Sequence, residues 1–306
     1  YIPWISDSYI ASALAIVVTA VLYFREELRG LPQRMSRQDI MSFFQFAAVA
    51  FILLPILPNE TYGPYQVINP YQIGWLVVLI SGLSLAGYVA LRLLRGKSGL
   101  LVVGLLGGMA STTATTLVYS RHSKAIPDFA KSSASIILLS HLVLFVRIAV
   151  IVAVVERSLL PAVLPWTVSG LLAGVICVTL MMVKRGAASQ TLPELTVSNP
   201  TELKTALGFA LVFSLVLLLS VWMHDVFHNA GGYIIAFLSG LTDVEPIAIA
   251  NMKLFSLGSI DAATATRAIA IAFVANLVFK LGIVFTAADR ALRRPVVIGF
   301  AVLFVG

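Results

Sequence analysis

Charged residues are scarce in this sequence: of its 306 residues only 11% are Asp, Glu, Lys or Arg, whereas 59% are hydrophobic. An ordinary soluble domain carries about 25% charged residues. A helix needs about 20 predominantly apolar residues to cross a bilayer, and this sequence offers such stretches one after another. The composition therefore predicts an all-α integral membrane protein with the lipid bilayer as its main partner.

Cysteine is almost absent as well. The single Cys177 lies inside an apolar run, which excludes an intrachain disulfide and a metal site built from cysteines. No P-loop, zinc-protease motif or Ser/His/Asp arrangement with usable spacing is found, so we expect neither an enzyme nor a resident cofactor beyond a bound Mg²⁺ or other cation.

The net charge of +7 comes from short basic clusters between apolar segments, where orientation signals belong, so nucleic-acid binding is not expected. The chain opens on Tyr1 without a basic region ahead of an apolar core, and it ends on Gly306 within an apolar run. We expect both ends to be cuts in a longer polypeptide.

Ten apolar segments are expected to lie in the membrane as helices, because lipid cannot satisfy free backbone groups and no barrel-like alternation is present. They are Ile10–Phe24, Phe43–Leu57, Ile73–Leu94, Leu100–Val118, Ser135–Val155, Trp166–Val183, Leu207–Trp222, Tyr233–Ala250, Ala268–Thr286 and Val296 onward.

Lys and Arg indicate which segments cross the membrane, because short cytoplasmic loops carry the excess of these residues. If all ten segments cross, the basic clusters around Arg121 and Lys184 fall opposite those around Arg29 and Arg95. If the fourth and eighth segments dip in and return, every basic cluster lies on one face. We therefore predict about eight transmembrane helices and two re-entrant, broken helices.

The same two segments carry glycine followed by a polar run where hydrocarbon is expected. The fourth reads Gly107-Gly108-Met109-Ala110-Ser111-Thr112-Thr113-Ala114-Thr115-Thr116, and the eighth reads Ser239-Gly240-Leu241-Thr242-Asp243-Val244-Glu245-Pro246. Glycine and proline permit a break in a helix. We predict helix breaks at Gly107, Gly108, Gly240 and Pro246.

Matching positions in the two halves indicate an internal repeat. Gly108 and Gly240 lie 132 positions apart, and the Asn-Pro pairs at 69 and 199 lie 130 apart. His141 and Asn276, 135 apart, form a third match. We predict one copy over residues 69–198 and a truncated copy over 199–306. Three crossings and one hairpin per copy would turn the second upside down, giving an inverted repeat. Such repeats are typical of transporters with a midplane site, although duplication also builds bundles that transport nothing.

Asp243 and Glu245 are the main candidate site, because ionisable side chains at membrane depth are costly and usually mark ion or proton pathways. On an unwound stretch before Pro246, both carboxylates and the neighbouring Thr242 could bind a hard cation such as Mg²⁺. These two acids are the predicted metal ligands. The alternative is that the hairpin tip reaches water and the acids are merely solvated.

Uncharged polar residues complete the candidate site. Hydroxyls of the fourth segment could coordinate an ion or bond to their own helix: Ser111, Thr112, Thr113, Thr115 and Thr116. His141 and Asn276 could serve a proton relay or an interhelical hydrogen bond. Arg147 and Lys280 could neutralise the acids or snorkel to an interface.

Several motifs resemble a known family: Leu53-Leu54-Pro55-Ile56-Leu57-Pro58, Asn69-Pro70-Tyr71, Ser84-Leu85-Ala86-Gly87-Tyr88, the run from Gly107 to Thr115, and Gly240-Leu241-Thr242-Asp243-Val244-Glu245. Over most of 38–306 the chain resembles the C-terminal domain of unknown function of MgtC/SapB-type bacterial membrane proteins, in which Asp usually stands where Glu245 is found. The resemblance implies that residues 1–37 hold the last helix of an MgtC-like membrane domain and a linker, and that 38–68 form a connecting transmembrane helix and loop.

We expect a multi-pass protein of the bacterial inner membrane that acts as a transporter or channel-like permease for a small ion, in the first place a divalent cation such as Mg²⁺, at the midplane between two broken helices. The alternative is a non-transporting regulatory or scaffold protein that binds another membrane protein or a lipid. Either protein could assemble as a homo-oligomer.

Overall fold

The computed structural model describes residues 37–93, 99–183 and 203–305, and within these ranges it contains no β-strand. The helix expected in 1–37 lies outside them. From Phe43 onward the predicted apolar segments are helical over nearly all of their described residues, so the all-α prediction is confirmed. The α-helices are α3 (Arg37–Ala48), α4 (Leu54–Ile56), α5 (Pro70–Leu93), α6 (Leu100–Ala125), α7 (Ala130–Val155), α8 (Leu160–Val183), α9 (Leu203–Thr242), α10 (Val244–Ser256), α11 (Ala262–Ala287) and α12 (Arg290–Val305). A π-helical turn, Val49–Leu53, joins α3 to α4.

Within the described ranges, six stretches are long and apolar enough to cross a membrane. They are Pro70–Ala90, Leu100–Ala125, Pro127–Val155, Arg157–Val183, Ala210–Phe227 and Ala262–Ala287. The outer helices support this assignment, because α8 exposes a row of apolar side chains that includes Leu164, Val168, Leu172 and Ile176. A water-facing surface rarely carries such a continuous apolar row. The chain is therefore a multi-pass membrane protein.

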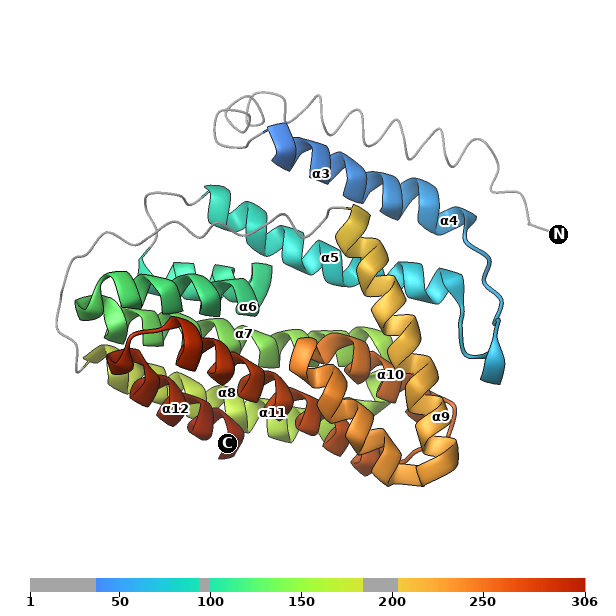
Figure 1. Ribbon diagram of the computed structural model, residues 1–306. Helices are drawn as coiled ribbons and strands as arrows, with labels where there is room; N and C mark the ends of the chain where they lie inside the picture. Colours follow the sequence, from blue (N-terminus) through green and yellow to red (C-terminus); the bar gives the residue numbers. More distant parts are fainter. Residues whose placement is uncertain (1–36, 94–98, 184–202, 306) are drawn as a thin grey trace.

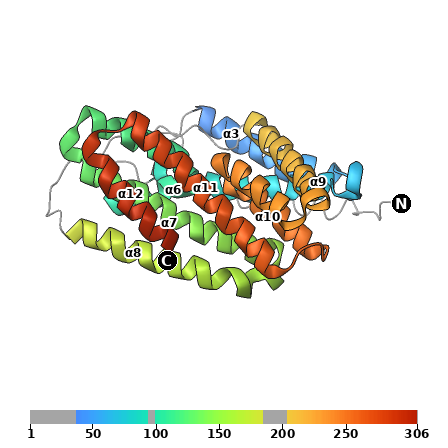
Figure 2. The same ribbon diagram turned by 60° about the horizontal axis from the view of Figure 1, so that its bottom comes forward.

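α7 forms the centre of the bundle and packs against α6, α8, α10 and α12 (Figures 1 and 2). In its most apolar stretch 78% of the residues are buried, against 22% in α8. Phe145 of α7 contacts Trp166 of α8 and Phe273 of α11, with ring centroids 5.7 and 4.5 Å away. An aromatic cluster thus joins three helices at the core.

Most helices begin earlier than the predicted segments, and in two of them the added turns contain a proline. The predicted segments start at Trp166 and Val296, each directly after a proline, whereas α8 begins at Leu160 and α12 at Arg290. The two prolines therefore lie inside the helices, where each removes one backbone hydrogen bond. The surrounding helices hold these turns despite that loss.

α6 folds back on itself at Ser111, which interrupts the helix in an extended conformation (φ −170°, ψ 113°). A Cβ atom on Gly108 would lie 2.6 Å from the Cα of Ser140 in α7, and one on Gly104 would lie 2.6 Å from the Cβ of Leu139. In a straight α6, Gly108 would lie about 25 Å from Ala125, the last residue of that helix. Ser140 lies only about 15 Å along α7 from its first residue, Ala130. The contacts therefore require a reversal, after which the first arm of α6 runs parallel to α7 and the second arm runs antiparallel to it.

α9 also consists of two arms. Its 40 residues bend sharply near Gly231, whose Cβ would lie 2.9 Å from the carbonyl carbon of Met223. Residues eight positions apart in a straight helix are separated by about 12 Å. Figure 1 shows the resulting turn at the lower right, between the apolar stretches Ala210–Phe227 and Ala230–Thr242.

The second arm of α9 and α10 form another broken helix. Asp243 separates them in an extended conformation (φ −153°, ψ 144°), 132 positions after Ser111. A Cβ on Gly240 would lie 2.5 Å from the Cα of Ala272 in α11. Gly108 and Ser140, each 132 positions earlier, make the corresponding contact. α11 has 26 residues, like α7, and begins 132 positions after it. The order of elements from α5 to α8 thus recurs from α9 to α12.

α7 and α11, which match at this spacing, run in opposite directions. The backbone N–H of Asp289, just after α11, donates to the Oγ of Ser123 at the end of α6 (3.3 Å), so α11 ends near the start of α7. Conversely, Glu156, which follows α7, lines the same pocket as Lys253 and Ser256 of α10, so α7 ends near the start of α11.

Basic residues gather at the end of the bundle where α7 begins and α11 ends, which we call the basic end: Arg121, Lys124, Lys131, Arg290, Arg293 and Arg294. The sequence predicts such a concentration for a cytoplasmic face, and three single basic residues, Arg157, Lys253 and Arg267, lie at the other end. We refer to the other end as the opposite end.

Cysteine labelling tests the reversal in α6. In a background with Cys177→Ala, we expect Gly99→Cys and Ile126→Cys, which flank α6, to react with an impermeant maleimide from the same side of membrane vesicles. Ser256→Cys, at the opposite end, is the control and should react from the other side. Labelling of the two flanking positions from different sides would show that α6 crosses the membrane.

Candidate functional site

The two helix breaks lie at residues that cap the arm that follows. The Oγ of Ser111 accepts a hydrogen bond from the backbone N–H of Ala114 (3.2 Å), and the Oδ1 of Asp243 accepts one from that of Glu245 (3.4 Å). Side-chain caps of this kind satisfy N–H groups that a helix start leaves free.

The breaks predicted at the glycines and the proline were therefore misplaced. Gly107, Gly108 and Gly240 lie within helical arms, a few residues before the breaks, and the last two allow those arms to touch the backbone of a neighbouring helix. Pro246 lies in the first turn of α10, where its missing N–H costs little.

Charged side chains from three helices meet beside the second break. Glu245 of α10 is only 2% exposed and forms a salt bridge with Arg147 of α7, itself 8% exposed. Lys280 of α11 is 1% exposed, and its Nζ donates to the Oδ1 of Asn276. Asp243 is close enough to act electrostatically on both Glu245 and Lys280.

We call Arg147, Asp243, Glu245 and Lys280 the central charge cluster. Its two carboxylates and two basic groups carry a formal charge that sums to zero. Arg147 and Lys280 do not snorkel to an interface, since both are buried within the bundle. Asp243 differs from the other three because its side chain is exposed.

Asn276 bonds to a backbone carbonyl group that the second break leaves without its helical partner. Its Nδ2 donates to the carbonyl oxygen of Gly240 (3.0 Å), which a continuous helix would pair with the N–H of Val244. The same side chain accepts from Lys280. Asn276 thus connects the broken backbone with the central charge cluster.

His141 is fully buried, but it bonds within its own helix. Its Nδ1 lies 2.7 Å from the carbonyl oxygen of Ile137, and its ring packs 4.7 Å from that of Phe300 in α12. The matching contacts of Gly108 and Gly240 set the spacing of the repeat at 132 residues. At this spacing His141 aligns with Phe273 and Asn276 aligns with Leu144, so the predicted match between His141 and Asn276 is not kept.

The candidate hydroxyls donate mainly to their own segments. Thr115 and Thr116 donate to the carbonyl oxygens of Ser111 and Thr112 at 2.8 Å, and Thr242 donates to that of Ser239 at 2.8 Å. Thr112 is buried, whereas Ser111 and Thr113 are half-buried. These bonds favour the interpretation that the hydroxyls stabilise the hairpins.

No group of three or more His, Cys, Asp or Glu side chains that could hold a metal occurs among the residues that the structure describes. The predicted metal ligands Asp243 and Glu245 are neighbours, but Arg147 already binds Glu245. Mg²⁺ often binds one or two carboxylates and keeps several waters. Arg147 therefore competes with such an ion for the carboxylate of Glu245.

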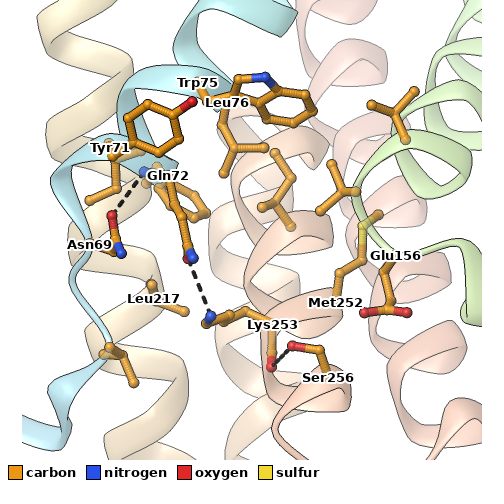
Figure 3. Close-up of a pocket in the computed structure, with 16 residues that line it drawn as sticks. Asn69, Tyr71, Gln72, Trp75, Leu76, Glu156, Leu217, Met252, Lys253 and Ser256 are labelled. Carbon is orange, nitrogen blue, oxygen red and sulfur yellow. Dashed lines mark hydrogen bonds between the residues drawn. The ribbon is translucent and has the colours of Figure 1, made fainter. Parts of the chain in front are cut away.

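A cavity of about 330 Å³ lies at the opposite end, between α5, the end of α7, α9 and α10 (Figure 3). The Nζ of Lys253 points to the Oε1 of Gln72 (3.2 Å), while Glu156 and Trp75 lie on other walls. Sequence reasoning missed this cavity because its residues come from four separate helices and form no local motif.

Comparison with known protein families assigns most of the described chain to one family. Residues 78–288 match the family described as "Domain of unknown function (DUF4010)". An uncharacterized protein of Aquifex aeolicus (strain VF5) is 25% identical over 203 residues, which cover 65% of this chain and 86% of that protein. No solved structure matches the chain. Both broken helices and the whole central charge cluster lie in the matched segment, and the chain belongs to the DUF4010 family.

Proposed function

We propose that this protein is a secondary transporter or channel-like permease for a small cation in a bacterial inner membrane. Residues 69–198 and 199–306 form two inverted copies, with about eight transmembrane helices and two re-entrant helices in all. The supporting observation is the central charge cluster, which lies at the break of one hairpin inside a bundle of apolar helices.

The free energy needed to place charged side chains inside a membrane supports a transport function. A charged side chain at the centre of a membrane costs about 2.5–3.5 kcal/mol on insertion scales, so such residues usually mark ion pathways. Four of them are present, together with two interrupted helices. The first arms of both hairpins end at the breaks, and the carbonyl groups at such helix ends suit cations.

Asp243 would be the entry ligand for the cation, because it is the exposed member of the cluster. Thr242, the residue before it, supplies a further oxygen at the same break. Mg²⁺ is the first divalent cation to test, because the chain resembles the MgtC/SapB-type proteins and its central charge cluster contains two carboxylates.

Uptake into proteoliposomes tests the proposal. Asp243→Asn should reduce cation uptake to that of empty liposomes, because the neutral amide cannot balance a bound cation. Asn caps a helix as well as Asp does, so the fold should survive. The matched control is Asp225→Asn, an exposed acid outside the cluster, which should transport normally. Undiminished uptake by Asp243→Asn would refute the proposal.

A regulatory or scaffold protein is the second candidate, and the salt bridge between Arg147 and Glu245 favours it, since such a pair can lock helices together. This candidate predicts no uptake of Mg²⁺ or of monovalent cations, and it predicts a membrane protein that co-purifies with the chain. It also predicts that Asp243→Asn leaves the purified complex intact.

A further inference from the structure

The charge of the central cluster restricts what can bind there. With Arg147 and Lys280 protonated and both acids ionised, the cluster is neutral, and three of its four members are less than 9% exposed. A cation that entered would leave an uncompensated positive charge at low dielectric, which is costly. Binding therefore requires that one positive charge leaves the cluster.

Arg147 cannot provide this charge. A guanidinium group stays protonated in proteins, and here it is fixed directly to Glu245. Lysine, in contrast, gives up its proton readily when it is buried. Among the residues that the structure describes, the only hydrogen-bond partner of Lys280 is the neutral amide oxygen of Asn276. A neutral amine can still donate to that oxygen, so losing the proton would not break the contact.

The other titratable groups near Lys280 do not compete for this role. From α7 it faces Arg147 and His141, and from the break before α10 it faces Asp243 and Glu245. His141 uses Nδ1 for the carbonyl of Ile137, and its Nε2 has no hydrogen-bond partner in the described part of the chain. A second proton on His141 would therefore be buried without a partner. α8 contains no charged residue, and the charged residues of α6 and α12 lie at the basic end.

We infer that the site exchanges one monovalent cation, bound at Asp243, for the proton of Lys280. This inference rests on the proposed function and narrows it. The ammonium group of Lys280 releases its proton to water and becomes a neutral amine, while the cation takes its place opposite the carboxylates. The cluster stays neutral throughout. A divalent ion exchanged for the same proton would leave one excess positive charge, so sodium- or potassium-like ions fit better than Mg²⁺.

Proteoliposomes with an internal pH-sensitive dye test the coupling. When NaCl or KCl is added outside, wild-type protein should take up the cation and release protons to the outside, so the dye should report a rise in internal pH. Because binding competes with protonation, uptake should rise with pH. Lys280→Gln keeps a donor for Asn276 but carries no proton to exchange, so any remaining uptake should move no protons and lose its pH dependence. Lys253→Gln, outside the cluster, is the control and should behave like wild type.

A binding measurement on the wild-type protein tests the exchange without relying on a variant that must first fold. In weakly buffered detergent solution, NaCl should release about one proton for each cation bound, and choline chloride should release none. Sodium or potassium uptake without proton release would overturn the inference while leaving the proposed function intact. Uptake of Mg²⁺ alone would overturn the monovalent assignment. No uptake of any cation would overturn the proposed function, and the inference with it.

Discussion

Arg147→Leu should be among the most damaging single substitutions in the protein. It leaves the carboxylate of Glu245, which is 2% exposed, without its ion-pair partner. Breaking a buried pair from one side costs about 3–5 kcal/mol. We expect a large drop in the thermal unfolding midpoint of the detergent-purified protein, followed by tryptophan fluorescence. The drop should be smaller in acidic buffer, where the buried acid can neutralise itself by taking up a proton.

The double variant Arg147→Leu/Glu245→Leu separates the ion pair from simple packing. It removes both charges and should recover most of the lost stability, because replacing a buried pair by apolar groups is often neutral or stabilising. Lys253→Leu changes a half-buried lysine at the opposite end and should have a minor effect. If Arg147→Leu melts like wild type, the salt bridge does not stabilise the fold.

Gly240→Ala should displace the second hairpin. Its new Cβ would lie 2.5 Å from the Cα of Ala272, and no flexible side chain can move away to make room. Overpacking of this kind costs about 1–3 kcal/mol and occasionally more. The shift would also strain the bond from Asn276 to the carbonyl of Gly240. We expect lower thermal stability and loss of cation uptake.

Gly282→Ala is the matched control in α11, because no atom lies within 4 Å of the position where its Cβ would be placed. Alanine should stabilise that exposed helical position by up to about 1 kcal/mol. Gly108→Ala, at the equivalent contact of the first hairpin, should behave like Gly240→Ala. Equal melting temperatures for the Gly240 and Gly282 variants would contradict the tight contact between the hairpin and α11.

Hydropathy and the pattern of basic residues were sufficient to predict the helices and their two interruptions, because both depend on local composition. The exact positions of the breaks were not predictable in this way. Gly108 and Gly240 stood out in the sequence, but they serve close contacts with α7 and α11, whereas the breaks occur at Ser111 and Asp243. A contact between helices cannot be read from a single segment.

The partner of Glu245 shows the same limit. Hydropathy placed Arg147, Lys280 and both acids in apolar segments, but it left open whether the basic residues neutralise the acids or snorkel to an interface. Which pair forms depends on how α7, α10 and α11 pack. In the structure Arg147 forms the salt bridge with Glu245, and Lys280 donates to the neutral amide oxygen of Asn276.

The two hairpins are alike in backbone but unlike in electrical character. At a spacing of 132 residues, Ser111 corresponds to Asp243 and Thr113 to Glu245, so the first hairpin carries hydroxyls where the second carries acids. Acids at these positions of the first hairpin would add two negative charges to the bundle, whereas Arg147 and Lys280 balance only the two acids of the second hairpin. The divergence of the two halves, more than their likeness, therefore keeps the charges inside the bundle balanced.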